Sequence, residues 1–167
     1  MNEENYSCEN CKNTVDKNAE HCDECGLIFN EKLLCINHMD KTAKGVCVIC
    51  SKPFCKECGL WINRGYLHEI FLCDEHSHYE IIEGMIRVYG TFDDVQAQYI
   101  CDCLEKEELH PFLFMRKASP IHLGGTNYTL YRPSGDFNGH IINENKIMIP
   151  CKELLIAERI IKEIITD

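Results

Sequence analysis

Thirteen cysteines dominate the chemistry that this 167-residue chain can perform. Ten of them, with two histidines, form six pairs in which two residues separate the partners. This spacing lets one tight backbone turn present two soft donors to one metal ion, and two such pairs complete a tetrahedral zinc site. The sequence therefore predicts three zinc ions per chain. The pairs are Cys8 with Cys11, Cys22 with Cys25, Cys35 with His38, Cys47 with Cys50, Cys55 with Cys58, and Cys73 with His76.

The spacing between pairs predicts which pairs share an ion. The first two pairs predict one site, formed by Cys8, Cys11, Cys22 and Cys25. The gap between Cys50 and Cys55 is too short for those two neighbouring pairs to close on one ion, so we expect the other sites to interleave. One would use Cys35, His38, Cys55 and Cys58, and the other Cys47, Cys50, Cys73 and His76. His68 and His78 are alternatives to His76.

Each predicted site is filled by four protein ligands. A catalytic zinc keeps one position open for water or substrate, so these sites favour structural roles. The soft donors favour zinc over harder metals, although iron also fits the four-cysteine site. We therefore expect no enzymatic activity and predict no catalytic residue.

The two cysteine-rich stretches resemble known zinc modules. Cys8 to Gly26 resembles a short zinc ribbon. The ligand order from Cys35 to His76, with GVCVICSKPFCKEC and then LCDEH, resembles the B-box zinc finger, a cross-braced module with two zinc ions. It departs from the usual B-box in its last pair, where two histidines are common, and in its long gap before Cys73. These resemblances imply a zinc ribbon over residues 1–30 and a B-box-like module over residues 31–80.

Beyond residue 84 the cysteine pairs give way to the periodicity of an α+β domain. Thr91, with Asp94 three residues later, is expected to cap the first helix. The predicted order is β-α-β-β-α, with the helices on one face of the sheet. We expect strands over residues 85–89, 111–116 and 146–149, helices over 92–107 and 151–165, and candidate strands over 127–132 and 137–142.

The same region resembles a known family. The stretch IRVYGTFDDVQAQYICDCLEKEELHPFLF, followed by KIMIPCKELLIAERIIKEI, is similar to the prokaryotic signal transducing protein family. This is a ferredoxin-like domain related in fold to the PII regulators. The resemblance covers residues 84–165 and implies a ferredoxin-like α+β domain over residues 84–167, with a role in signal transduction.

Three further groups of residues are candidate functional sites. The apolar residues before Cys73 either pack on the next domain or form an exposed patch for a protein partner, anchored by Trp61, Tyr66 and Phe71. Cys151, at the start of the last helix, is a candidate reactive thiol because the helix dipole lowers a thiol pKa. A positive cluster beside a glycine-rich loop is a candidate site for a small ligand, and it consists of Arg116, Lys117 and Arg132.

Charge and composition narrow the function. The formal net charge is −10, and filling the sites makes it about −14, because ten thiolates outweigh three Zn²⁺ ions. This charge opposes nucleic-acid binding, which depends on neutralising phosphates with Lys and Arg. Paired cysteines without a signal-peptide core or a membrane-spanning run fit a reducing cytoplasm.

We therefore expect a cytoplasmic, non-catalytic zinc protein that binds a protein partner in a regulatory role. Sensing of a small ligand by the C-terminal domain is the alternative, and nucleic-acid binding through the zinc ribbon is a third interpretation. The C-terminal domain is also a candidate for self-association.

Overall fold

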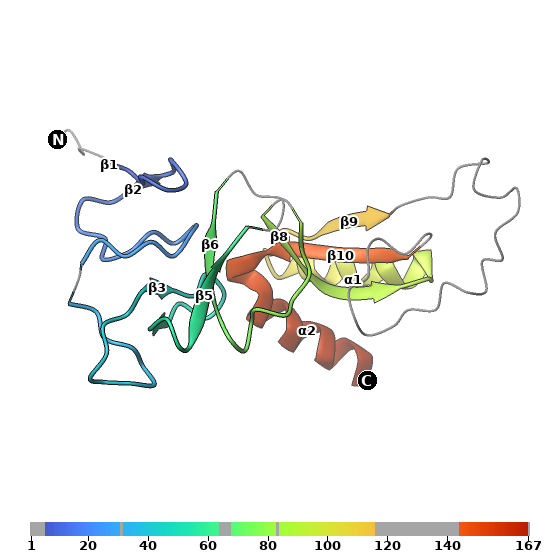
Figure 1. Ribbon diagram of the computed structural model, residues 1–167. Coiled ribbons are helices and arrows are strands. Elements are labelled where there is room, and N and C mark those ends of the chain that lie inside the picture. The colour runs from blue at the N-terminus through green and yellow to red at the C-terminus, as the bar shows by residue number, and fades with distance from the viewer. Residues whose placement is uncertain (1–5, 31, 64–67, 83, 116–143, 167) are drawn as a thin grey trace, which may run out of the picture. The chain divides into compact units, whose positions relative to one another are not determined.

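The computed structural model describes residues 6–30, 32–63, 68–82, 84–115 and 144–166 (Figure 1). The chain divides into two compact units, Met1–Gly84 and Met85–Asp167. The first unit contains both cysteine-rich stretches, and the second contains the α+β region. Neither described helix is long and apolar enough to cross a membrane.

Short hairpins connected by the metal-ligand turns build the first unit. Its described residues form three antiparallel pairs, β1 with β2, β3 with β4, and β5 with β6. Strands of two to four residues are too short to be stable through pairing alone, so this unit depends on its metal sites. The strands are β1 (Tyr6–Ser7), β2 (Thr14–Val15), β3 (Gly45–Val46), β4 (Pro53–Phe54), β5 (Gly59–Ile62), β6 (Ile70–Cys73) and β7 (Ile81–Ile82).

Phe71 is the central core residue of the first unit, with 1% of its surface exposed. A Cβ atom added at Gly45 would lie 2.2 Å from its ring, and one added at Gly59 would lie 2.8 Å from it. Trp61 packs against the ring edge-on, with the centroids 5.4 Å apart. The prediction that Phe71 anchors a partner is therefore wrong, because its ring fills space that two glycines leave free.

Backbone hydrogen bonds join the two cysteine-rich stretches into one body. Val46 N donates to Gly26 O at 2.9 Å, and Phe71 N donates to Cys25 O at 2.9 Å. The Asn10 side chain adds a bond to Glu69 O at 2.8 Å. The residues expected to form a separate zinc ribbon therefore share a backbone network with the residues expected to form the B-box-like module.

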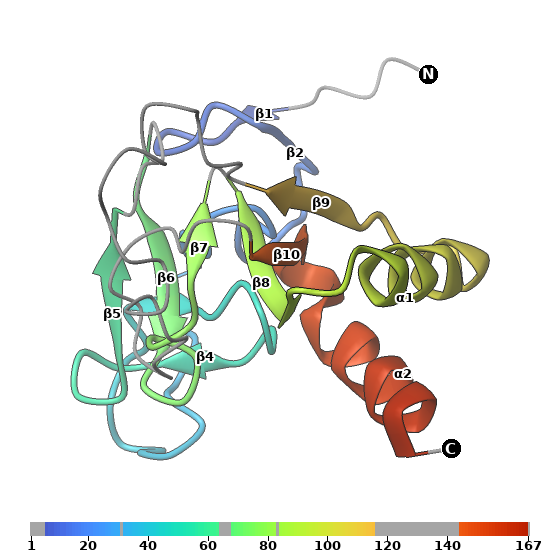
Figure 2. The same ribbon diagram turned by 90° about the vertical axis from the view of Figure 1, so that its right-hand side faces the viewer.

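An antiparallel sheet covered by two helices forms the second unit. Its strands β8 (Met85–Thr91), β10 (Asn145–Pro150) and β9 (Phe112–Met115) are neighbours in that order. Because β8 and β9 are both antiparallel to β10, they run parallel to each other. Helices α1 (Asp94–Lys106) and α2 (Leu154–Thr166) lie on one face of these strands (Figure 2). The core side chains Ile86, Ile147 and Ile149 are fully buried.

The predicted order of helices and strands is confirmed for residues 85–115 and 144–166, but both helices start differently. The cap of α1 is Asp93, whose carboxylate accepts from Val95 N at 2.8 Å and Gln96 N at 3.0 Å. The prediction of Thr91 as the cap is wrong, because its hydroxyl accepts instead from Asp93 N. A 3₁₀ turn, Cys151–Glu153, precedes α2. The candidate strands over 127–132 and 137–142 lie outside the described residues.

Candidate metal centres

The twelve predicted ligands come together in three clusters of four, with the pairing expected from the sequence. We call them site 1 (Cys8, Cys11, Cys22, Cys25), site 2 (Cys35, His38, Cys55, Cys58) and site 3 (Cys47, Cys50, Cys73, His76). In each site the four ligand atoms lie within 4.8 Å of one another. Tetrahedral zinc separates two sulfurs by about 3.8 Å and a sulfur from a nitrogen by about 3.6 Å. The donor types and their spacing therefore fit three zinc ions per chain.

Site 1 is held by two backbone turns of the same form. Its sulfurs approach as zinc requires, with Cys8 Sγ 3.6 Å from Cys25 Sγ and Cys11 Sγ 3.5 Å from Cys22 Sγ. The Cys8 turn follows β1 and leads into β2, so the hairpin positions one ligand pair. Cys11 is half-buried, whereas the other three ligands are buried.

A residue with positive φ follows three of the four cysteine-only pairs, the exception being Cys55 with Cys58. The angles are 63° at Lys12, 80° at Gly26 and 54° at Ser51. Each of these residues donates its N–H to the carbonyl of the first cysteine of its pair, at 2.8 to 2.9 Å. This conformation wraps the backbone around the sulfurs. Gly26 adopts it without strain, while Lys12 and Ser51 carry a Cβ atom into the left-handed region.

Site 2 contains His38 as its nitrogen ligand. His38 Nδ1 lies 3.3 Å from Cys58 Sγ, 3.5 Å from Cys55 Sγ and 3.8 Å from Cys35 Sγ. The Asn37 side chain also hydrogen-bonds to Cys58. That contact orients a ligand from outside the coordination sphere, a role that sequence reasoning missed, although the position of Asn37 inside the ligand pair was a usable signal.

In site 3 the fourth ligand is a histidine, and the structure distinguishes among the three candidates. His76 Nδ1 lies 3.1 Å from Cys73 Sγ and 3.5 Å from Cys47 Sγ, and His76 is 8% exposed. His78 instead packs against Tyr79, with the ring centroids 4.7 Å apart. His68 belongs to none of the three sites. His76 is therefore the ligand.

Hydrogen bonds prepare some thiols for metal binding. A hydrogen bond from Cys50 and several backbone N–H groups lower the pKa of Cys47 to about 4. The same contact with Cys47, together with burial, raises the pKa of Cys50. Burial opposes ionisation of Cys35, but hydrogen bonds from Cys55, Asn37 and His38 outweigh it and lower the Cys35 pKa to about 6. Burial also raises the pKa of Cys73, so zinc binding at site 3 must displace protons that Cys50 and Cys73 tend to keep.

The other predicted site residues do not form a second centre within the described parts of the chain. Trp61 is half-buried beside Phe71. Cys151 is half-buried in the 3₁₀ turn, and Cys101 is buried on α1. Four predicted residues lie outside the described residues, namely Tyr66, Arg116, Lys117 and Arg132.

Comparison of the chain with protein-family models, with curated proteins and with solved structures finds no match. The resemblances noted in the sequence are therefore not supported by an independent relative. The three Cys/His sites, in contrast, are established by the positions of their own ligand atoms.

Proposed function

We propose that this chain is a non-catalytic zinc protein whose first unit binds a protein partner in a regulatory role. The supporting observation is that all three sites provide four protein ligands each. A zinc ion with four protein ligands has no position for a substrate or an activated water. The ions would instead stabilise the folded unit, because the binding free energy of a structural zinc, about 10–16 kcal/mol, is coupled to folding.

Apolar side chains displayed on this metal scaffold support a role in protein interaction. The loop that carries Cys35 and His38 exposes Leu34 by 50%, Ile36 by 46% and Met39 by 81%. Three large apolar residues exposed within six positions on a rigid zinc site form a surface of the kind that binds protein partners.

We also infer a finer assignment for each unit. The interleaved sites 2 and 3 support a B-box-like module, extended by the ribbon-like site 1. In the second unit, parallel β8 and β9 flank an antiparallel β10, and α1 connects them. This is the arrangement of a split β-α-β motif and supports a ferredoxin-like domain. A signal-transducing protein of a reducing prokaryotic cytoplasm is consistent with both assignments.

Two experiments test the proposal on the full-length chain. With Co²⁺ in place of zinc, visible spectra report tetrahedral thiolate coordination, and added azide or cyanide should leave the spectra unchanged. A spectral shift would reveal an exchangeable position and overturn the non-catalytic assignment. The tagged protein, loaded with zinc or stripped by TPEN, is then used to recover partners from cell extract. A partner retained equally by the stripped protein would contradict a role for the zinc-dependent unit.

A further inference from the structure

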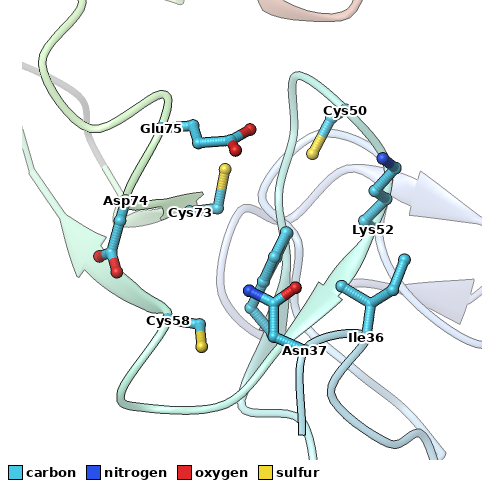
Figure 3. Close-up of a pocket in the computed structure, with 9 residues that line it drawn as sticks. Ile36, Asn37, Cys50, Lys52, Cys58, Cys73, Asp74 and Glu75 are labelled. Atoms are coloured by element: carbon cyan, nitrogen blue, oxygen red, sulfur yellow. The ribbon is translucent and has the colours of Figure 1, made fainter.

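We propose that a cleft between sites 2 and 3 binds the lysine or arginine side chain of a basic segment in the partner protein. This inference rests on the proposed function and names the chemistry of the partner. The cleft has a volume of about 140 Å³ and opens to solvent. Figure 3 shows the residues that line it. Its walls include ligands of both metal sites, Cys58 from site 2 and Cys50 and Cys73 from site 3.

The charge around the cleft favours a cation. A zinc ion bound by three thiolates and one neutral histidine carries a net charge of −1, and two such centres border the cleft. Asp74 and Glu75 add two exposed carboxylates. Among the described residues that line the cleft, Lys52 is the one that carries a positive charge. Negative groups therefore outnumber positive ones, and low-dielectric walls concentrate their field.

The size and the apolar lining favour a long basic side chain over a free small molecule. Typical small-molecule pockets have volumes of about 300–1,000 Å³, so this cleft suits one side chain. Ile36 and Phe54 line it and can contact a methylene stem while the charged end faces the carboxylates. Met39, which is 81% exposed, follows Ile36 in the same loop. It offers a second contact for an apolar residue beside the lysine or arginine.

The test uses the full-length zinc protein and two capped peptides. The first has a central lysine–leucine pair flanked by glycine and serine. The second is identical except that norleucine replaces the lysine. Binding is followed by ¹⁵N NMR. The lysine peptide should shift signals of residues 36–37, 50–54 and 73–75 and leave the site 1 turns unchanged. The norleucine peptide should bind more weakly. Equal binding of both peptides, or shifts confined to other residues, would overturn the proposal.

Charge variants test the sign of the effect. Removing one carboxylate with Glu75→Gln should weaken lysine-peptide binding by about threefold to fivefold, the scale of one partly exposed ion pair. Lys52→Gln should strengthen binding by a similar factor, since it removes the repelling charge. Glu105→Gln on α1 is the matched control and should have no effect. Metal analysis confirms that each variant retains three zinc ions. Failure of Lys52→Gln to strengthen binding in a zinc-loaded protein would contradict the cleft assignment.

The outcomes separate this inference from the proposed function. A zinc-dependent partner whose binding ignores both Glu75→Gln and Lys52→Gln would leave the function standing and refute the cleft. Peptide binding with both predicted signs, in a chain that recovers no zinc-dependent partner, would support the cleft and refute the proposed function.

Discussion

Gly26 offers a direct test of how the first unit is held together. It follows the last ligand of site 1 with a φ of 80°. A Cβ atom at this position would lie 2.0 Å from Val46 O and 3.0 Å from Phe71 Cβ. The same residue accepts the hydrogen bond from Val46 N. We predict that Gly26→Ala destabilises the entire first unit, including sites 2 and 3.

The expected magnitude follows from three contributions. The left-handed conformation costs an L-residue about 1–2 kcal/mol. Contact with a backbone oxygen cannot be relieved by a rotamer change, so the hydrogen bond from Val46 is lost at about 1 kcal/mol. Displacement of the neighbouring core costs about 1–3 kcal/mol. A total of roughly 3–6 kcal/mol lowers the apparent zinc affinity by about 10²- to 10⁴-fold, because metal binding and folding are coupled.

The assay is competition for zinc with a chromophoric chelator, read together with the metal content per chain. Lys12→Gly and Ser51→Gly are the matched controls, since both positions have the same positive φ. Each control should increase the stability by about 0.5–1 kcal/mol, because glycine removes the strain. The reasoning is refuted if Gly26→Ala changes affinity by less than a factor of two. Loss of zinc from site 1 alone would refute the single folded body.

Three further predictions concern buried charge, thiol reactivity and acid. Arg87→Met should destabilise the second unit by about 2–3 kcal/mol in urea unfolding, because the Glu144 carboxylate, which is 2% exposed, loses its ion-pair partner. Adding Glu144→Leu should recover most of this loss. No recovery in the double variant would contradict the buried-charge explanation. Burial and nearby carboxylates raise the pKa of Cys101 above 9.0. A smaller fraction of this side chain is therefore thiolate at pH 8, and iodoacetamide should label it more slowly than Cys103. The free energy of unfolding should also fall as pH rises past 9.0, because the thiol of the unfolded chain loses its proton first. Without zinc, the lowered pKa of Cys47, about 4 against 9.0, contributes stability that is present above pH 9.0 and is lost as pH falls through about 4. In the zinc-loaded protein, acid competes with zinc for the site 3 thiolates. A zinc indicator should therefore detect release from site 3 on acidification, and retention of this zinc at pH 3 would contradict the expectation.

Much of the metal chemistry could be predicted from local sequence. Two residues between ligands limit the separation of two donors through covalent geometry alone, and the short segment between Cys50 and Cys55 prevents neighbouring pairs from closing together. The pairing in sites 1 to 3 follows from these local limits. Helix and strand periodicity likewise predicted α1, β8 and β10, because side-chain direction repeats along each element.

Other features were decided only by contacts between distant residues. Phe71 lies in an apolar run whose pattern is compatible with either a buried or an exposed position. Its burial depends on Gly45 and Gly59, which are distant in sequence and whose missing side chains leave space for the ring. His76 is chosen over His68 and His78 because the chain returns to place it beside Cys47. The backbone hydrogen bonds that Phe71 N and Val46 N donate to the carbonyls of Cys25 and Gly26 unite two stretches that the sequence presents as separate modules. Thus the sequence by itself determined the zinc ligands other than the last histidine, because ligand spacing is local, whereas packing across the chain selected His76 and decided which surfaces remain for a partner.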